Sequence, residues 1–512
     1  MRLQWMLLSA GLVTSVLAVT AQAELISGTI SSVAASSGRI SVQTTADRSR
    51  SFRVGDDTQF SLDGKPVKVD QLAAGQRVSI FTSTGGEVTK VVARSGSPAP
   101  VASTPKPQPK PATASEPDTP RSSSSSNEWT QFGGPNRDNI STETGLMQSW
   151  PAAGPPLKWS IRGLGEGYSS VSLSGNRLLT MGNRGDREMT LCFDVETGRE
   201  LWATQTGAAY REGQGNGPRG TPTIDGNRVY VLGANGDLAC LDLDTGARQW
   251  GGNILQEFGG SNITWGISES VLIDGDRLIC TPGGRAATMV ALDKASGRTI
   301  WQARVPSNPQ AAYSSIVPLE LGGSRQYVNF VHNAVVGIDA SSGQALWGNT
   351  SAANGTANCS SPLVLGNQVF AASGYGTGGT LIELSGNRSG VQANQVYHTK
   401  DMKNHHGGMV LRDGYLYGTD EAILKCLELK TGAVQWQSRS VGKGAVVYAD
   451  GQIILRSEQG PVAMFTATPT GYQENGRFEP PRSDRPAWPH PVVAAGCLFL
   501  RDMDQLHCYR LR

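Results

Sequence analysis

The residues with the most chemical potential lie in eight short, glycine-rich stretches spread over the last three-quarters of the chain. Each stretch combines polar or charged side chains with aromatic ones, and three of the six histidines fall within them. Convergent polar groups beside aromatic rings are the usual form of a ligand site. The twelve candidate ligand-binding residues are Glu166, Tyr168, Arg219, Trp265, Glu269, Tyr313, Asn358, His405, His406, Lys443, Trp488 and His490.

Two kinds of binding chemistry suit this set. Carboxylate and amide oxygens are the ligands that Ca²⁺ takes in proteins, and Glu166, Glu269 and Asn358 could supply them. Arg219 and Lys443 could bind the carboxylates of an anionic molecule, with a tryptophan of the set stacked on it. The eight stretches contain no aspartate, so no general base stands out and no catalytic residue is assigned.

The histidines admit a metal site only in one combination. His405 and His406 are adjacent, and neighbouring side chains on an extended backbone point in opposite directions. One of the two can therefore face a channel, and a zinc-type site would need His490 together with that one and a glutamate. A histidine hydrogen-bonded to a backbone carbonyl is the simpler expectation.

The element that must position these stretches is a repeat. The pattern D-x-x-[ST]-G-x-x-x-W occurs in residues 194–202, 242–250, 293–301 and 339–347, and recurs with a leading glutamate in residues 428–436. Aspartate before Thr-Gly or Ser-Gly favours a tight turn, because its side chain can bond the nearby backbone and glycine accepts a positive φ. The turn is therefore predicted to join two strands.

The number of repeat units can be counted from one aromatic position that recurs in each of them. Successive occupants are 39 to 51 residues apart, which is typical of four-stranded β-propeller blades. We interpret this position as a docking slot between neighbouring sheets, and its occupants are Trp159, Trp202, Trp250, Trp301, Trp347, Tyr397, Trp436 and Phe478.

Eight slots predict eight blades and a particular closure. Trp159 has no blade before it, and no aromatic follows the final strand near Tyr509. The strand around Leu157 is therefore expected to complete the last blade, which leaves no free sheet edge. In such a ring each glycine-rich stretch leads into an innermost strand, so all eight should meet at one mouth of a central channel. Small residues such as Ser170 and Thr221 are expected to leave that channel open.

The turn motif resembles the PQQ-like repeat, named after pyrroloquinoline quinone. The opening Trp129-Thr-Gln-Phe132-Gly-Gly-Pro-Asn-Arg137 also resembles the start of a group of exported bacterial PQQ-like propeller proteins. The resemblance implies an all-β fold, an eight-bladed quinoprotein-type propeller over residues 129–512. For an enzyme it implies a PQQ-dependent oxidoreductase with PQQ and Ca²⁺, although the adjacent cysteines of many quinoprotein alcohol dehydrogenases are missing.

Four of the seven cysteines occupy one repeat position, two residues before the aspartate position. They are Cys192, Cys240, Cys426 and Cys508, and other blades have alanine or glycine there. Equivalent positions in different blades lie too far apart for a disulfide, which needs Cα atoms within about 7 Å. We expect free, buried thiols that act as small apolar side chains.

The first quarter of the chain has three parts. Residues 1–23 form a predicted signal peptide, with an apolar run and cleavage near Ala23, and its removal places the protein in the periplasm or outside the cell. Residues 24–95 alternate like a small β-barrel of OB-like type, and residues 96–128 form a Pro/Ser-rich linker. No other segment is apolar enough to span a membrane.

Three functional hypotheses follow. The first is a ligand- or protein-binding scaffold of the cell envelope, similar in architecture to the propeller subunit of the outer-membrane assembly machine. The second is a quinoprotein dehydrogenase. The third is a propeller enzyme or carbohydrate binder that uses the His/Glu/Arg cluster. Across the three hypotheses, the expected partners are envelope proteins, a small molecule or a glycan. A net charge of +2 without a basic stripe argues against nucleic acid.

Overall fold

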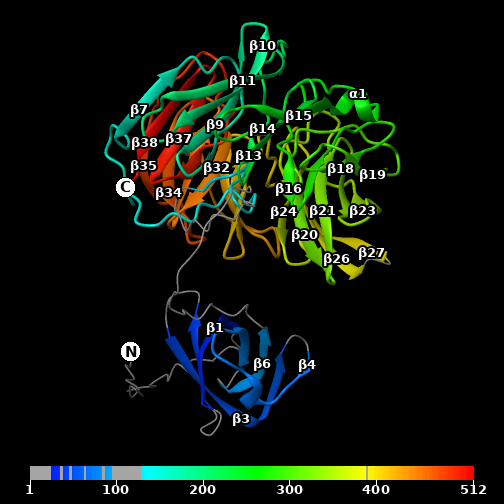
Figure 1. The fold of residues 1–512 in the computed structure, drawn as a ribbon. Coiled ribbons are helices and arrows are strands. Elements are labelled where there is room, and N and C mark those ends of the chain that lie inside the picture. Colours follow the sequence, from blue (N-terminus) through cyan, green and yellow to red (C-terminus); the bar gives the residue numbers. More distant parts are fainter. Residues whose placement is uncertain are drawn as a thin grey trace, which may run out of the picture. The chain divides into compact units, whose positions relative to one another are not determined.

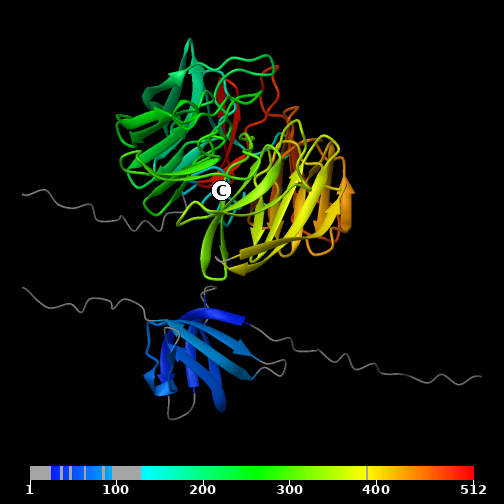
Figure 2. The same ribbon diagram turned by 90° about the vertical axis from the view of Figure 1, so that its right-hand side faces the viewer.

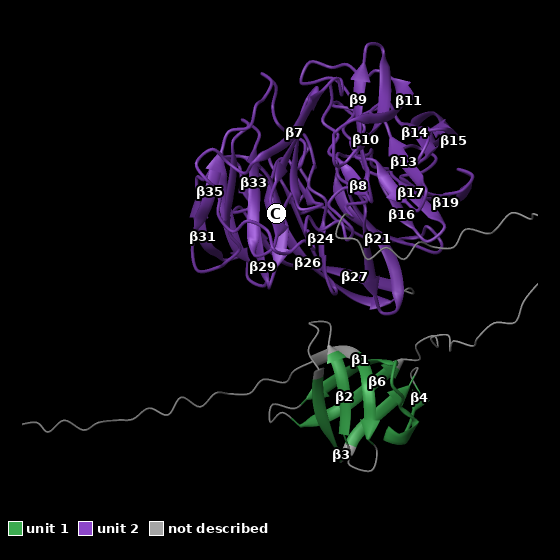
Figure 3. Cartoon of the chain, turned by 60° about the vertical axis from the view of Figure 1, so that its left-hand side comes forward, with its two compact units in different colours: residues 1–117 green, residues 118–512 purple. Residues whose placement is uncertain are grey.

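The computed structural model describes residues 25–34, 39–44, 49–62, 65–82, 87–94, 128–387 and 390–512. The chain divides into two compact units, residues 1–117 and 118–512 (Figure 3). The predicted signal peptide lies outside the described residues, as does the predicted linker except for Glu128. In the described part of the chain, no helix has the length and apolar character needed to cross a membrane.

The first unit is a small β-barrel. Its strands are β1 (Leu25–Ala34), β2 (Arg39–Thr44), β3 (Ser49–Leu62), β4 (Lys65–Pro66), β5 (Arg77–Thr82) and β6 (Val88–Arg94), with a short 3-10 helix at Val69–Gln71. The order β2-β1-β5-β6-β3 closes because β2 also pairs with β3. Alternate residues point inward, so Ile40, Val42, Val78, Ile80 and Val91 fill the barrel.

The second unit consists of eight antiparallel four-stranded sheets, which are the blades of a propeller (Figures 1 and 2). Blades one to four are β8 (Ser172–Ser174), β9 (Arg177–Arg184), β10 (Arg187–Asp194), β11 (Glu200–Ala208); β12 (Thr223–Asp225), β13 (Arg228–Leu232), β14 (Asp237–Asp242), β15 (Arg248–Asn253); β16 (Leu272–Asp274), β17 (Arg277–Cys280), β18 (Met289–Asp293), β19 (Thr299–Ala303); and β20 (Val317–Leu321), β21 (Ser324–Val331), β22 (Ala334–Asp339), β23 (Ala345–Asn349). The short helix α1 (Ile254–Phe258) follows β15.

The remaining blades have the same strand order. They are β24 (Leu363–Leu365), β25 (Gln368–Ser373), β26 (Gly378–Asn387), β27 (Gly390–Thr399); β28 (Val410–Arg412), β29 (Tyr415–Asp420), β30 (Ile423–Glu428), β31 (Val434–Ser438); β32 (Gly444–Ala449), β33 (Gln452–Ser457), β34 (Val462–Thr466), β35 (Glu474–Phe478); and β36 (Val492–Ala494), β37 (Cys497–Asp502), β38 (Gln505–Arg510) with β7 (Leu157–Arg162). Together with the barrel, this arrangement confirms the predicted all-β fold class.

The ring closes with the predicted strand. β7 pairs antiparallel with β38, with Trp159 opposite Cys508 and Leu157 opposite Tyr509. The last blade is thus built from both ends of the propeller segment, and no strand edge is left at the junction.

The aromatic slot joins neighbouring blades through a hydrogen bond as well as packing. The indole N–H of Trp202 donates to the carbonyl of Leu243 at 2.9 Å, and that of Trp250 donates to the carbonyl of Lys294 at 3.0 Å. Trp159, Trp301 and Trp436 and the Tyr397 hydroxyl donate in the same way to the following blade. The turn glycine of the next blade lies against most of these rings; at Gly297, φ is +74° and an added Cβ would come within 2.8 Å of Trp250.

Two slots depart from this scheme. Trp347 donates within its own blade to Gln326 at 2.8 Å, because Gly337 leaves room for the ring and the next blade has the long β26–β27 hairpin in place of the turn motif. Phe478 has no donor and packs edge-on against Trp150 and Tyr509. Trp347 still packs with Val369, Ala371 and Ile382 of the next blade, so it contacts that blade through packing without the indole hydrogen bond.

The cysteines lie directly beneath the aromatic slot. Cys192, Cys240, Cys426 and Cys508 are fully buried and stand opposite Trp202, Trp250, Trp436 and Trp159 on the neighbouring strands. All seven cysteines are free. A bulky residue at this position would collide with the aromatic ring, which explains the preference for a small side chain.

Candidate functional site

A segment outside the blades closes the centre of the ring. Residues 129–141 form bridges or backbone hydrogen bonds with β8, β12 and β32. The Arg137 guanidinium donates to the carbonyls of Ser270 and Val271 in blade three, and the Asn139 amide donates to the carbonyl of Met409 in blade six. Because one short segment contacts innermost strands on both sides of the ring, it fills the channel. We call residues 129–141 the plug.

Small side chains bordering the channel link adjacent blades. The backbone N–H of Thr221 donates to the Ser270 hydroxyl at 2.9 Å, that of Ser270 donates to Ser315 at 3.0 Å, and that of Ser315 donates to Ser361 at 3.1 Å. The Ser170 hydroxyl donates to the carbonyl of His490 at 2.8 Å across the closure. These residues were expected to keep the channel open; instead they fasten the innermost strands to one another.

Above the plug lies a cavity of about 270 Å³ that opens at the mouth. Phe132 of the plug lines it from within the ring, and its ring centroid lies 4.9 Å from that of His490. The remaining lining residues come from loops of seven of the eight blades and are Tyr168, Ser170, Gln214, Arg219, Thr221, Trp265, Ser268, Tyr313, Ala357, Cys359, Tyr375, His405, His406, Trp488, Pro489 and His490. We call this cavity the mouth pocket.

Eight of the twelve candidate residues line the mouth pocket. They are Tyr168, Arg219, Trp265, Tyr313, His405, His406, Trp488 and His490. The aromatic members form pairs, with ring centroids 4.8 Å apart for Tyr168 and Trp488 and 5.6 Å apart for Trp265 and Tyr313. The mouth therefore brings together side chains that are more than 300 residues apart in the sequence.

The other four candidates are placed elsewhere. Glu166 is partly exposed and accepts hydrogen bonds from the Asn216 amide at 3.1 and 3.2 Å. Glu269 is fully buried and accepts from the backbone and hydroxyl of Thr281, and burial raises the pKa of its carboxyl to about 7. Asn358 uses its amide to hold the backbone of its own loop and the carbonyl of His332.

Lys443, the fourth of these, does not line the pocket and belongs to a charged cluster around Glu458. Its ammonium lies 3.0 Å from Glu458, which also accepts from His406 Nε2 at 2.8 Å and from the Trp488 indole at 3.3 Å. Burial works to raise the pKa of the Glu458 carboxyl, but hydrogen bonds and charges from His406 and Lys443 outweigh it and bring that pKa to about 2. Burial lowers the pKa of His406.

Both adjacent histidines contribute to the pocket, so the expectation that only one of them faces the channel is wrong. The reason is local: residues 405–406 form a bend, followed by Gly407 and Gly408 with positive φ, and are not part of an extended strand. The two histidines nevertheless pair with different carboxylates, His405 with Glu421 and His406 with Glu458. His405 Nε2 lies 2.8 Å from Glu421, and its ring lies 4.6 Å from that of Tyr375.

His490 is held as a neutral acceptor. Its Nε2 lies 2.9 Å from the carbonyl oxygen of His406, which assigns the proton to Nε2. Burial lowers the pKa of His490 to about 4. Its Nδ1 is buried and makes no hydrogen bond within the described chain, and the same is true of the Thr221 hydroxyl.

Arg219 is fully engaged by its surroundings. Its guanidinium donates to the carbonyls of Gly215 and Gly217, lies 3.2 Å from Glu212, and sits over the rings of Tyr168 and Tyr210. Such a guanidinium fixes the geometry of its loop and has little capacity left for a ligand carboxylate.

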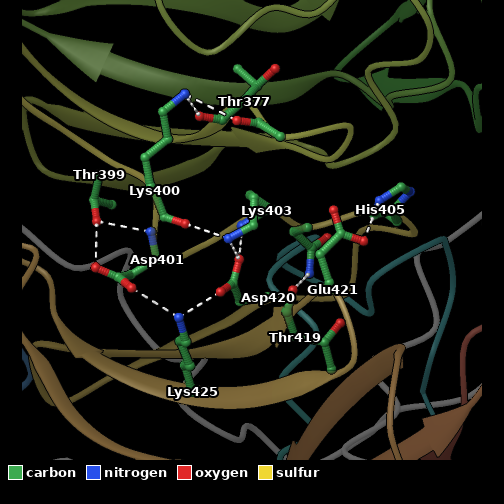
Figure 4. A network of polar contacts seen from close by, with 12 residues as sticks. Thr377, Thr399, Lys400, Asp401, Lys403, His405, Thr419, Asp420, Glu421 and Lys425 are labelled. Carbon is green, nitrogen blue, oxygen red and sulfur yellow. Dashed lines mark hydrogen bonds and ion pairs between the residues drawn. The ribbon is translucent and has the colours of Figure 1, made fainter.

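An ionic network centred on the buried Lys425 and Asp420 supports the loop that carries the two histidines (Figure 4). Lys425 lies 2.5 Å from Asp420 and 2.9 Å from Asp401, and Asp420 also pairs with Lys403 at 2.7 Å. Burial works to raise the pKa of Asp420, but the two lysines outweigh it and lower that pKa. Lys403 is two residues from His405, so the network fixes the start of this loop.

Buried arginines hold other loops of the mouth in place. Arg501 donates to the carbonyls of Gly165, Ser169 and Met181, and thereby fastens the loop that carries Tyr168. Arg456 contacts Asp502 and the carbonyl of Pro489 beside His490. The signal in the sequence is an arginine at the next-to-last position of a strand whose preceding three residues are apolar.

The pocket does not fit PQQ with Ca²⁺. The predicted oxygen ligands Glu166, Glu269 and Asn358 do not line it, and their side chains are committed to other partners. Arg219 and Lys443, expected to bind carboxylates, are paired with acidic residues. Within residues 25–512, as far as the structure describes them, no group of three or more His, Cys, Asp or Glu is placed to hold a metal ion.

Several pocket residues were not predicted from the sequence. Tyr375 lines the pocket, and Glu421 and Glu458 pair with its histidines. Each follows the second strand of a blade, because the hairpin between the first and second strands returns the chain to the mouth. Phe132 belongs to the plug. The glycine-rich stretches mark only the loop before the first strand of each blade. The loop after the second strand could have been located from the order of strands in the repeat.

Comparison with known proteins places this geometry in a family. A family model described as outer membrane protein assembly factor BamB matches residues 140–266 and 186–438. The proteins of that name from Shewanella oneidensis and Pseudomonas aeruginosa are 23% and 30% identical over 219 and 153 residues, which cover 42% and 29% of this chain and 51% and 37% of theirs. The chain thus spans about half or less of the curated relatives that it matches.

A solved structure supports the fold alone. The quinohemoprotein alcohol dehydrogenase from Comamonas testosteroni has a TM-score of 0.52 at 10% identity, over 75% of this chain and 80% of that one. The family model, in contrast, matches more than half of the sequence. The chain therefore belongs to the PQQ-like β-propeller family described by the outer membrane protein assembly factor BamB model.

Proposed function

We propose that the chain is a non-catalytic binding scaffold of the cell envelope that assists the assembly of outer membrane proteins. The proposal places it in the periplasm, with the mouth pocket as its ligand-binding site. The relatives that it matches are named assembly factors for outer membrane proteins, and the propeller is the part of the chain that carries the match.

The observation that carries a binding role is the pairing of charges at the mouth. Arg219 pairs with Glu212, His405 with Glu421, and Lys443 and His406 with Glu458. General acid–base catalysis needs a group within hydrogen-bond reach of the reacting atom whose pKa lies near the working pH. His490, with a pKa of about 4, and Cys359, whose thiol pKa burial raises to about 12, do not meet that need.

The rigidity of the mouth also favours binding. Arg137, Arg456 and Arg501 are buried and hold the loops through backbone carbonyls, and the lining residues already stand in contact with one another. A preformed site loses little conformational entropy when its ligand arrives, so a modest contact area can give useful affinity.

The proposal is tested by deleting the gene in the host and measuring the amount of folded outer membrane β-barrel proteins in isolated membranes. The deletion should lower it, and the wild-type chain should restore it. A chain with Trp265→Ala and Trp488→Ala should restore it less well, because both side chains line the pocket and are partly exposed. Val434→Ala, an exposed outer-strand change, is the control. Unchanged membrane protein levels in the deletion strain would contradict the proposal.

A further inference from the structure

We infer that the mouth pocket binds a neutral, polyhydroxylated ring, that is, a sugar residue of an envelope glycan. The inference rests on the proposed function in taking the mouth pocket as the ligand-binding site, and it adds the chemical class of the ligand. It follows from three features of the lining: flat aromatic walls, charges that are already paired, and three buried polar atoms without a partner in the described chain, on Tyr168, Thr221 and His490.

The walls of the pocket present aromatic faces on more than one side. Tyr168 pairs with Trp488 across the closure between blades eight and one, and Trp265 pairs with Tyr313 at the junction of blades three and four. Phe132 adds a ring from the plug. A pyranose has apolar C–H faces and polar edges, so it can lie against such rings while its hydroxyls reach the polar residues between them.

The charges of the pocket select against an ionic ligand. Arg219, His405 and His406, the ionisable lining residues with acidic neighbours, are each within 3.2 Å of a carboxylate. An anionic ligand would have to separate one of these pairs and leave a partly buried carboxylate without its partner. A cationic ligand would meet carboxylates that are already neutralised. A neutral ligand meets neither cost.

The unpartnered atoms require hydrogen-bonding groups on the ligand. His490 Nδ1 is an acceptor because Nε2 carries the proton, and the Thr221 hydroxyl can both donate and accept. Leaving such buried atoms unsatisfied costs free energy, and an apolar ligand would leave that cost in place. A ligand hydroxyl can donate to His490 Nδ1 and exchange a second bond with Thr221, whereas an ionised carboxylate has no proton to donate to the imidazole.

The plug favours the end or a branch of a glycan over an extended chain. Phe132 and the innermost strands close the cavity below, so a ligand can enter from the mouth alone and cannot pass through the ring. A peptide could insert only a side chain from the mouth, and its amide groups would stay outside the pocket.

The experiment is a calorimetric titration of the full chain with a panel of probes of similar size. The panel contains neutral trisaccharides of glucose and of N-acetylglucosamine, an acidic uronic acid trisaccharide, and an uncharged tripeptide. We expect saturable binding of at least one neutral trisaccharide, accompanied by a change in tryptophan fluorescence, and weaker or no binding of the acidic probe and the peptide. Preference for the acidic trisaccharide or for the peptide would overturn the inference, as would the absence of binding by both neutral sugars.

Thr221→Val separates ligand contact from folding. Valine has the shape of threonine without the hydroxyl, so the change removes a buried group that has no partner and should leave the melting temperature unchanged or higher. Loss of one hydrogen bond should weaken binding of the neutral sugar about three- to tenfold. Thr299→Val, at an exposed position outside the pocket, should bind like the wild type. Unchanged affinity of Thr221→Val would overturn the assignment of this hydroxyl to the ligand.

The two proposals fail in different ways. If no neutral sugar binds but outer membrane protein levels still depend on Trp265 and Trp488, the ligand class is wrong and the envelope function stands. If sugar binds and the deletion strain has normal outer membrane protein levels, the envelope function is wrong and the ligand class stands.

Discussion

The outer part of the propeller, where the aromatic slot lies, and the mouth are built in different ways; we call this outer part the rim. At the rim, one indole-to-carbonyl contact recurs from blade to blade with small variations. At the mouth, each blade contributes a different side chain, and the loops are held by arginines and ion pairs that occur once each. The comparison teaches that repetition specifies the ring, whereas the binding surface arises where equivalent positions differ.

The largest effect is expected from the network that supports the mouth. Lys425→Met should lower the free energy of unfolding by about 3–5 kcal/mol, because it leaves the buried Asp420 carboxylate without one of its lysine partners. Lys400→Met, which removes an exposed lysine bonded to two backbone carbonyls nearby, is the control and should cost well under half as much. Urea denaturation measures both; equal losses would mean that the buried network adds no special stability.

The rim should respond somewhat less strongly. Trp250→Ala removes an indole that packs against Gly297 and donates to Lys294, and should cost about 3 kcal/mol, near the lower end for large aromatic side chains because the ring is partly exposed. Val434→Ala, an exposed change on an outer strand, should stay within about 0.5 kcal/mol. A loss as small as that of the control would show that the slot does not hold blades two and three together.

A pH titration sharpens the contrast further. The pKa of Glu458 is about 2 in the folded protein and lies below its ordinary value of 4.5, so this carboxylate stabilises the fold above about pH 4.5 and that contribution is lost as pH falls toward 2. Glu458→Gln should therefore cost about 1–2 kcal/mol at pH 7, after allowance for solvent screening, and much less near pH 2. The two proteins should converge in urea midpoint on acidification; a constant difference would contradict the assignment.

The smallest effect concerns the cofactor that the repeat is named after. Adding PQQ and Ca²⁺ to the purified chain should change neither the quinone absorbance nor the melting temperature, because the predicted oxygen ligands do not face the pocket. A quinone spectrum shifted on the protein, with a raised melting temperature, would mean that the mouth rearranges to accept the cofactor.

The difference between rim and mouth also explains what could be predicted from the sequence. The turn motif and aromatic slot define strands and closure, since Asp194 and its equivalents bond the turn in the same way each time. Tyr168 and Trp488 are predictable as mouth residues because each precedes an innermost strand. Glu458 and Phe132 are not, because their positions depend on pairing partners in three dimensions. Glu269 and Asn358 satisfy the same sequence rule as Tyr168, yet Glu269 accepts from Thr281 after the second strand of its blade and Asn358 accepts from Asn354 of its own loop.

The closure of the ring has a consequence for biosynthesis. β7 and β38 pair residues near the two ends of the propeller segment, such as Ser160 and His507, which are 347 positions apart. Contacts of such high sequence separation form late and slowly, because a long loop must be closed before they contribute stability. During synthesis β7 therefore stays without its partner strand until β38 has been made, whereas all strands of the small barrel lie within residues 25–94. The eighth blade is therefore the last to be completed, after the strands of the seven blades between its two parts have been made.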